Sequence, residues 1–211
     1  MSALQTQLEQ ALAQLELTLS DEQVAKLMQY LELLQKWNKV YNLTAIRDPQ
    51  EMLVKHIFDS LAVVSHIEAE RIIDVGTGGG LPGIPLAICR PEMQVHLLDS
   101  NSKKTRFLIQ AKAELKLENV QVLHQRVESY QPEPPYDGVI SRAFASLEDM
   151  LTWTHNLLPI NGTWWAMKAQ KEVDELDRLP GYAQIDRVID LQVPQLNADR
   201  RLIKITKTAH A

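Results

Sequence analysis

A short apolar run that breaks into glycines limits the folds open to this chain more strongly than any other segment. Arg71–Val75 is followed by glycines at positions 76, 78, 80 and 83 and by Pro82. Glycines permit positive φ angles and let the backbone approach a ligand closely. The pattern predicts a strand, a tight loop and a helix with Pro82 as its first residue. Free N–H groups of the loop would then face an anionic or hydrogen-bonding ligand.

Two acidic residues near the glycines indicate the kind of ligand. Gly78-x-Gly80-x-x-Gly83 fits the dinucleotide-binding fingerprint, which is a weak signal on its own. Asp74 lies inside the strand, where a buried carboxylate needs donors such as loop N–H groups. A second apolar run ends at Asp99, about 20 residues after the glycines, where an acid commonly binds ribose hydroxyls. We predict a nucleoside ligand; the alternatives are a glycine turn that serves only packing and a solvated strand-end acid.

The N-terminal segment has the pattern of a helical lobe. Leucines at positions 4, 8, 12 and 15 form one stripe of an amphipathic helix. Ser20 and Gln23 form a capping box for a second helix, and Asp48–Pro49 begins a third that should reach about residue 65. We therefore divide the chain into a helical lobe, residues 1–67, and a second domain, residues 68–211.

In the second domain, short β-rich runs alternate with helical runs, which favours an α/β fold with a largely parallel sheet. The expected strands are Arg71–Val75, Gln94–Asp99, Val120–His124, Gly138–Arg142, Gly162–Lys168, Ala183–Val193 and Arg201–Thr206. The expected helices are Gly83–Arg90, Lys103–Lys116, Leu147–Leu158 and Lys171–Leu179. No helix separates the last two strands, so we expect them to pair antiparallel. Seven strands ending in such a pair resemble the Rossmann-like sheet of class I methyltransferases.

Composition and charge exclude several classes of protein. No run of about 18 apolar residues exists, and the polar N-terminus lacks the features of a signal peptide. We therefore expect a cytoplasmic protein without membrane contact. The single cysteine, Cys89, lies in an apolar run and is expected to be a buried, inert thiol. A net charge of -5 argues against a uniformly basic nucleic-acid-binding surface but allows a local basic patch.

Six motifs in a fixed order carry a resemblance that covers nearly the whole chain. They are Trp37–Thr44, Arg47–Pro49, His56-x-x-Asp59-Ser60, Asp74–Pro85, Leu98–Ser100 and Ser141–Phe144. Together they resemble the RsmG (GidB) family of bacterial small-subunit rRNA methyltransferases. The resemblance implies an S-adenosylmethionine-dependent enzyme that methylates N7 of guanine 527 in 16S rRNA of the small ribosomal subunit. The chain departs from the family pattern at Gly79, usually alanine or proline, and at Ala169, usually glycine.

The chemistry of the residues and the resemblance together suggest a cofactor site. Gly76 and Gly78 would let the loop pass close under the cofactor, and the Leu81 N–H would donate toward its amino-acid end. As the family match implies, the Val127 N–H and the Glu128 carboxylate would bind the adenine edge. From the sequence alone, Glu128 is equally well explained as a surface residue. The expected cofactor-binding residues are Gly76, Gly78, Leu81, Asp99, Val127, Glu128 and Arg142.

Arg142 closes the expected fourth strand, where ligands of such folds bind. Arginine commonly reads O6 and N7 of guanine, but a donor on N7 would occupy the lone pair that must attack the methyl group. We therefore assign Arg142 to the cofactor carboxylate, with a solvated strand-end arginine as the alternative. Since N7 loses no proton, we identify no catalytic base and expect His56, Asp59 and Glu128 to be binding or structural groups.

Basic residues in both domains are candidates for RNA contact. The expected RNA-binding residues are Lys39, Arg47, His56, Lys168, Arg200 and Arg201, with Lys36, Lys55 and Lys204 as further candidates. Charge clusters are more often solvated faces, so the resemblance carries much of this assignment. Trp37 and Tyr41 are able to stack on a base, although Trp37 lies on an apolar helix face and is expected in the core. His56 has no evident metal partners, and a surface or capping role is its alternative.

Two other functions are compatible with the same residues. The glycines would also suit a nicotinamide-dependent oxidoreductase, although the chain has no room for the second substrate domain that dehydrogenases commonly carry. A non-catalytic RNA-binding protein with a nucleoside pocket is the other alternative. We expect a monomer that holds no metal ion.

Overall fold

The computed structural model describes residues 2–144, 146–169 and 179–209, which form a seven-stranded sheet. The strand order is β3-β2-β1-β4-β5-β7-β6. Strands β1 to β5 pair in parallel, whereas β7 lies antiparallel between β5 and β6. The strands are β1 Arg71–Val75, β2 Gln94–Asp99, β3 Val120–His124, β4 Gly138–Ser141, β5 Thr163–Ala169, β6 Ala183–Leu191 and β7 Arg200–Lys207. The expected strands and the antiparallel final pair are confirmed.

Side-chain caps determine where the longer helices begin. Ser2, Ser20, Asp48, Asn101 and Ser146 each accept a hydrogen bond from a backbone N–H of the first helical turn, and the expected capping box at Ser20 is formed. The helices are α1 Ala3–Gln14, α2 Asp21–Tyr41, α3 Pro49–Met52, η1 Leu53–Phe58, α4 Asp59–Leu61, η2 Val64–His66, α5 Gly83–Cys89, α6 Ser102–Glu114, η3 Val127–Ser129, α7 Leu147–Thr154 and η4 His155–Leu157. The helix expected over Lys171–Leu179 lies outside the described residues apart from its final position. In the part of the chain that is described, no helix is both long and apolar enough to span a membrane.

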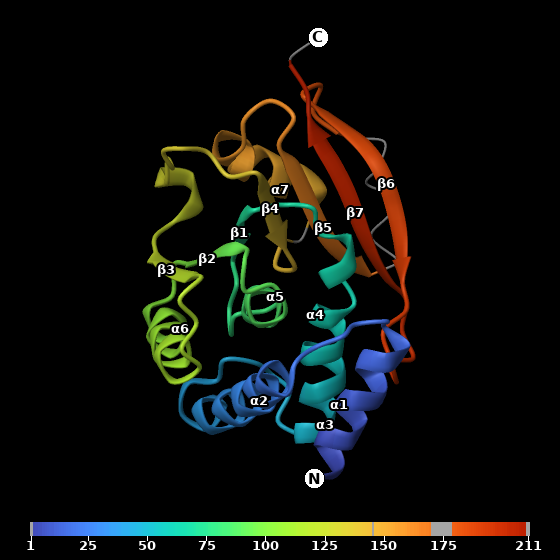
Figure 1. The fold of residues 1–211 in the computed structure, drawn as a ribbon. Coiled ribbons are helices and arrows are strands. Elements are labelled where there is room, and N and C mark those ends of the chain that lie inside the picture. Colours follow the sequence, from blue (N-terminus) through green and yellow to red (C-terminus); the bar gives the residue numbers. More distant parts are fainter. Residues whose placement is uncertain (1, 145, 170–178, 210–211) are drawn as a thin grey trace.

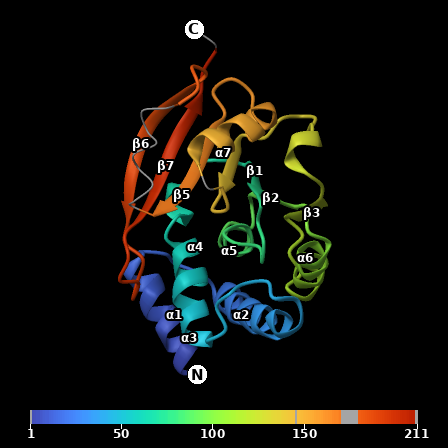
Figure 2. The same cartoon turned by 180° about the vertical axis from the view of Figure 1, so that it is seen from behind.

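Strands β1 and β4 are buried on both faces of the sheet, and their successive residues point to opposite sides. Ile72 and Leu97 belong to a buried cluster that includes residues of α1, α2, α5 and α6, whereas Ile73 and Val139 belong to a second cluster with α7. Figures 1 and 2 show α5 (green) and α7 (orange) on opposite sides of the sheet. The first cluster continues from the helical lobe into the sheet domain. The division of the chain at residue 67 stays a prediction.

Of the two expectations for the helix after the glycine loop, a range that begins at Gly83 is confirmed, whereas Pro82 as the first helical residue is wrong. Helix α5 starts at Gly83, and Pro82 precedes its first turn. The N–H groups of Gly80 and Leu81 both donate to the Thr77 carbonyl, at 2.9 and 3.0 Å. This tight turn completes the loop before helical geometry begins.

Candidate functional site

The glycine loop joins the carboxyl end of β1 to α5, and its conformation requires glycine. Gly76 and Gly78 have φ angles of +69° and +61°, which side chains rarely adopt. A Cβ atom on Gly76 would lie 2.9 Å from the Cβ of Ala143, which follows β4. The loop therefore packs closely against the end of a neighbouring strand.

Hydrogen bonds within the chain occupy most N–H groups of this loop. Gly78 donates to Asp99 and Gly83 donates to Asp74, both at 2.9 Å. The Leu81 N–H, expected to be available to a ligand, instead donates to Thr77. That part of the expectation is wrong because the turn before α5 uses the donor itself.

Asp74 is fully buried beneath the loop. Its Oδ2 accepts hydrogen bonds from the Thr77 hydroxyl at 2.6 Å and from the Gly83 N–H. The expectation that loop donors meet this carboxylate is confirmed. Its Oδ1 has no hydrogen-bond partner among the described residues. Burial outweighs the two hydrogen bonds and raises the pKa of Asp74 to about 6.

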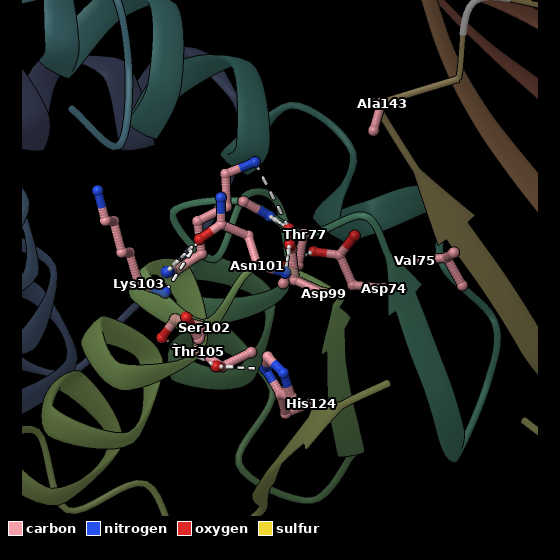
Figure 3. A network of polar contacts seen from close by, with 12 residues as sticks. Asp74, Val75, Thr77, Asp99, Asn101, Ser102, Lys103, Thr105, His124 and Ala143 are labelled. Atoms are coloured by element: carbon pink, nitrogen blue, oxygen red, sulfur yellow. Dashed lines mark hydrogen bonds and ion pairs between the residues drawn. The ribbon is translucent and has the colours of Figure 1, made fainter. Parts of the chain in front are cut away.

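Asp99 is also buried, in contrast to the alternative of a solvated strand-end acid. Its Oδ2 accepts from the Gly78 N–H and its Oδ1 from the Asn101 N–H, each at 2.9 Å. The Lys104 ammonium lies 3.7 Å from Oδ2. Figure 3 shows Asp74, Thr77 and Asp99 gathered where β1 and β2 end. Asp99 thus fixes the loop and the start of α6 together.

Two adjoining cavities lie at the carboxyl ends of the strands, and Gly76 and Ala143 line both of them. The larger has a volume of about 450 Å³ and is lined by Val75, Gly76, Leu98, Asp99, Ser100, Gln125, Arg126, Val127, Glu128, Ala143, Phe144, Asp149 and Trp153. The smaller has a volume of about 190 Å³ and is lined by Leu34, Leu43, Thr44, His56, Gly76, Thr77, Gly78, Gly79, Leu81, Arg142 and Ala143. All seven residues expected at the cofactor therefore border one cavity or the other. Ala143 and Phe144 belong to the Ser141–Phe144 motif but were assigned no role, and Trp153 was not singled out at all.

A third cavity, of about 710 Å³, lies between α1 and α2. Its lining comes entirely from the helical lobe, far along the chain from the glycine loop. Ligands of parallel α/β sheets bind outside the carboxyl ends of the strands. We therefore place the functional site at the two adjoining cavities of about 450 and 190 Å³.

His56 lies in an unforeseen π-helical segment, η1, within the helix expected over residues 49–65. The Asp59 N–H reaches the Val54 carbonyl, five residues earlier. The His56 Nδ1 donates to the Lys55 carbonyl at 3.1 Å, so Nε2 accepts from the Thr44 hydroxyl at 2.8 Å. Burial, aided by the charge of Arg142, lowers the pKa of His56 to about 4. π-Helical turns are frequent at functional sites.

Arg142 and Arg200 share one carboxylate. Arg142 Nη1 lies 3.1 Å from Asp59 Oδ2, and Arg200 Nε lies 3.0 Å from Asp59 Oδ1. Arg142 Nη1 also lies 3.3 Å from the Lys55 carbonyl oxygen. These contacts join α4, the end of β4 and the start of β7 beside the smaller cavity.

The remaining RNA candidates do not form one surface. Lys39 and Arg47 are exposed on the helical lobe, whereas Lys168 is buried and donates to the Phe144 carbonyl at 2.9 Å. Arg201 pairs with Asp190 at 2.8 Å. Because Arg200 and Arg201 are successive residues of β7, their side chains point to opposite faces.

Trp37 packs at the edge of the core, as expected. Its ring stacks on Tyr41 with centroids 5.2 Å apart and contacts Phe107 of α6 at 5.8 Å. The ring therefore links α2 to α6.

Comparison with known proteins identifies the family. A model of the GidB family, described as rRNA small subunit methyltransferase G, matches residues 23–203. The chain belongs to this family. A family protein from Hydrogenovibrio crunogenus, named ribosomal RNA small subunit methyltransferase G, is 67% identical over 188 residues, which cover 89% of this chain and 87% of the relative. A protein of the same name from Vibrio vulnificus is 50% identical over 208 residues, 98% of this chain and 99% of the relative.

Solved structures confirm the expected class I fold. A SAM-dependent methyltransferase from Aquifex aeolicus aligns with a TM-score of 0.57 at 17% sequence identity. The alignment covers 81% of this chain and 97% of that protein. At this identity the likeness concerns the arrangement of the sheet and its helices.

Proposed function

We propose that this protein transfers a methyl group from S-adenosylmethionine to N7 of guanine 527 in 16S rRNA. Membership of the GidB family and the names of its relatives support methylation of small-subunit rRNA. The observation that carries the proposal is the convergence of all seven expected cofactor residues on two adjoining cavities. One chain supplies these groups, which suits a cytoplasmic monomer that needs no metal ion.

The residues at the larger cavity fit the nucleoside half of the cofactor. Asp99 uses one lone pair of each oxygen for Gly78 and Asn101. A carboxylate has about four acceptor positions, so others are available to ribose hydroxyls. Val127 and Glu128 lie in the same cavity and would bind the adenine edge. Gly76 and Ala143 form the wall between the two cavities. Because Gly76 has no Cβ, its backbone can approach the ligand closely.

The smaller cavity fits the amino-acid end of the cofactor and the target base. Arg142 is proposed to bind the carboxylate of the amino-acid group. Gly78 and Leu81 would provide close van der Waals contact, since their N–H groups donate within the chain. His56 borders this cavity and would contact the substrate nucleotide. Lys39, Arg47, Lys168, Arg200 and Arg201 stay proposed RNA contacts.

The chemistry requires alignment more than proton transfer. When bound, S-adenosylmethionine supplies an electrophilic methyl group on a positively charged sulfur. Guanine N7 already has a lone pair, so the N7–carbon bond forms as the carbon–sulfur bond breaks and no proton leaves. The protein holds the two groups in line, which can remove several kcal/mol from the barrier. His56, Asp59 and Glu128 therefore act by binding and orientation.

Transfer of tritium from labelled S-adenosylmethionine to 16S rRNA, followed by mapping of the labelled nucleotide, tests the proposed function. We expect one labelled position, guanine 527. The matched control is the same RNA carrying 7-deazaguanine there, which replaces the nucleophilic nitrogen by carbon and should accept no methyl group. Label in the deaza RNA, or at another base, would contradict the proposal.

Replacing His56 with glutamine should leave methyl transfer independent of pH between about 7 and 9, as in the unmodified enzyme. The pKa of His56 in the unmodified enzyme is about 4, so its ring is neutral across this pH range. The range begins above the pKa of Asp74, about 6. Single-turnover rates at saturating RNA and cofactor provide the measurement. A rise of about tenfold per pH unit that disappears in His56→Gln would reveal a required base.

Replacing Lys36 and Lys39 with glutamine should weaken RNA binding and flatten its dependence on log salt by about 0.7 to 0.9 per lost phosphate contact. Neither lysine makes an ion pair within the described residues. Arg201 and Lys204 already pair with carboxylates at 2.8 Å, so their replacement by glutamine should change the slope less. Filter binding over a salt series compares the two double variants. The opposite order would show that Arg201 and Lys204 contact phosphates more strongly than Lys36 and Lys39 do.

A further inference from the structure

Among the ion-paired acids of the described residues, Asp59 and Asp99 are deeply buried, and Asp59 is the one bonded to two arginines. Its side chain is 1% exposed and both of its oxygens are bonded to arginines. By contrast, Asp190 and Glu68, which pair with Arg201 and Lys204, have side chains 73% and 75% exposed. Exposed pairs of that kind are weak and their partners separate readily. Asp59 is instead held in one position by the structure around it.

The π-helical segment explains why Asp59 is so firmly placed. The Asp59 N–H donates to the Val54 carbonyl. The carbonyl of Lys55, one helical turn before Asp59, accepts from both His56 Nδ1 and Arg142 Nη1. The Ser60 hydroxyl donates to the His56 carbonyl at 2.6 Å. The segment that carries Asp59 is thus tied to Arg142 by backbone as well as by the carboxylate.

A guanidinium group is planar, so one fixed hydrogen bond restricts the direction of its other donors. Asp59 binds Arg142 through Nη1 and Arg200 through Nε, and both arginine side chains are 29% exposed. Each arginine therefore retains further N–H donors for a ligand. The three side chains carry a net positive charge of one, which is appropriate beside anionic groups.

We propose that Asp59 is a positioning residue that orients Arg142 for the cofactor carboxylate and Arg200 for a phosphate of the RNA. One buried carboxylate thereby sets the geometry of two ligand contacts that are 58 residues apart in the chain. This inference rests on the proposed function. It adds that the two arginines depend on the same acid, although Asp59 touches neither ligand.

The test measures two affinities in Asp59→Asn: that for S-adenosylhomocysteine by calorimetry and that for 16S rRNA by filter binding. We expect both to weaken by about tenfold, as for the loss of a charge-assisted contact. Arg142→Gln should weaken only cofactor binding, and Arg200→Gln only RNA binding. Adding Asp59→Asn to Arg142→Gln should cause little further loss of affinity for the cofactor, and adding it to Arg200→Gln should cause little further loss of affinity for RNA. The reason is that the effects of substitutions in residues that act as a unit are not additive.

Tyr136→Phe is the matched control for a loss of stability. Tyr136 is buried just before the amino end of β4, lines neither cavity of the site, and its hydroxyl bonds His96 and Tyr130. This control should lower the unfolding temperature but keep both affinities. Equal affinities in Asp59→Asn and the unmodified protein, or full additivity in the double variants, would overturn the proposal.

If Asp59→Asn does not fold, Arg142→Lys and Arg200→Lys provide the test, since lysine retains the charge and lacks the oriented fork. We expect Arg142→Lys to weaken cofactor binding, and Arg200→Lys to weaken RNA binding, each by about tenfold. Unchanged affinity in both would show that charge alone is sufficient and would overturn the positioning role. Failure of the unmodified protein to bind S-adenosylhomocysteine or rRNA would instead count against the proposed function.

Discussion

Replacing Gly83 with alanine is expected to lower the free energy of unfolding by about 3 kcal/mol, the upper range for overpacking a buried position. The added Cβ would overlap the Leu97 side chain and lie 2.8 Å from Asp74 Oδ2. Leu97 belongs to β2, which lies between β3 and β1, and Asp74 is held by the Thr77 hydroxyl, so neither can move away freely. Urea denaturation measures the change.

Gly181→Ala is the matched control for this substitution. A Cβ atom at Gly181 would meet no other atom within 4 Å, and the residue needs no positive φ angle. Its replacement should leave stability unchanged or raise it slightly, by up to about 1 kcal/mol. Equal effects of the two substitutions would show that the contact of α5 with β1 and β2 is not tightly packed.

Replacing Asp99 with alanine is expected to weaken cofactor binding by about 1.5 to 3 kcal/mol, as for the loss of hydrogen bonds to a charged group. The substitution removes the acceptor for ribose hydroxyls and also frees the N–H groups of Gly78 and Asn101. The loop then loses the contact that holds it beside α6. Calorimetry with S-adenosylhomocysteine gives the affinity directly.

Asn101→Ala distinguishes the ribose contact from a general disturbance of the loop. The Asn101 side chain caps α6 by accepting from the N–H groups of Lys103 and Lys104, whereas its own N–H bonds Asp99. Loss of this cap should cost about 1 kcal/mol of stability. It should change cofactor affinity much less than Asp99→Ala does. Similar losses in both variants would contradict a direct ribose contact.

Local rules were sufficient to predict the sheet and the position of the glycine loop beside Asp99. Spacing along a single βαβ unit predicts strands β1 and β2, the glycines after β1 and the acid at the end of β2. Capping residues such as Ser20 and Asp48 likewise marked helix starts, because their hydrogen bonds reach only three residues ahead.

Contacts between distant segments were not predictable in the same way. The bond between Asp59 and Arg200 joins residues 141 positions apart, and no local pattern specifies it. The π-helical turn escaped detection because its apolar spacing also fits an α-helix. The Leu81 N–H was assigned to a ligand because sequence cannot tell which donors a turn uses for itself.

The wall formed by Gly76 and Ala143 has a consequence for inhibitor selectivity. A compound confined to the larger cavity meets mainly strand ends and the loops that follow them, which belong to a sheet shared with many methyltransferases. A compound extended past Ala143 would also meet Leu34, Thr44 and His56, which come from the helical lobe. Discrimination between this family and other enzymes of the same fold should therefore depend on chemical groups placed beyond that wall.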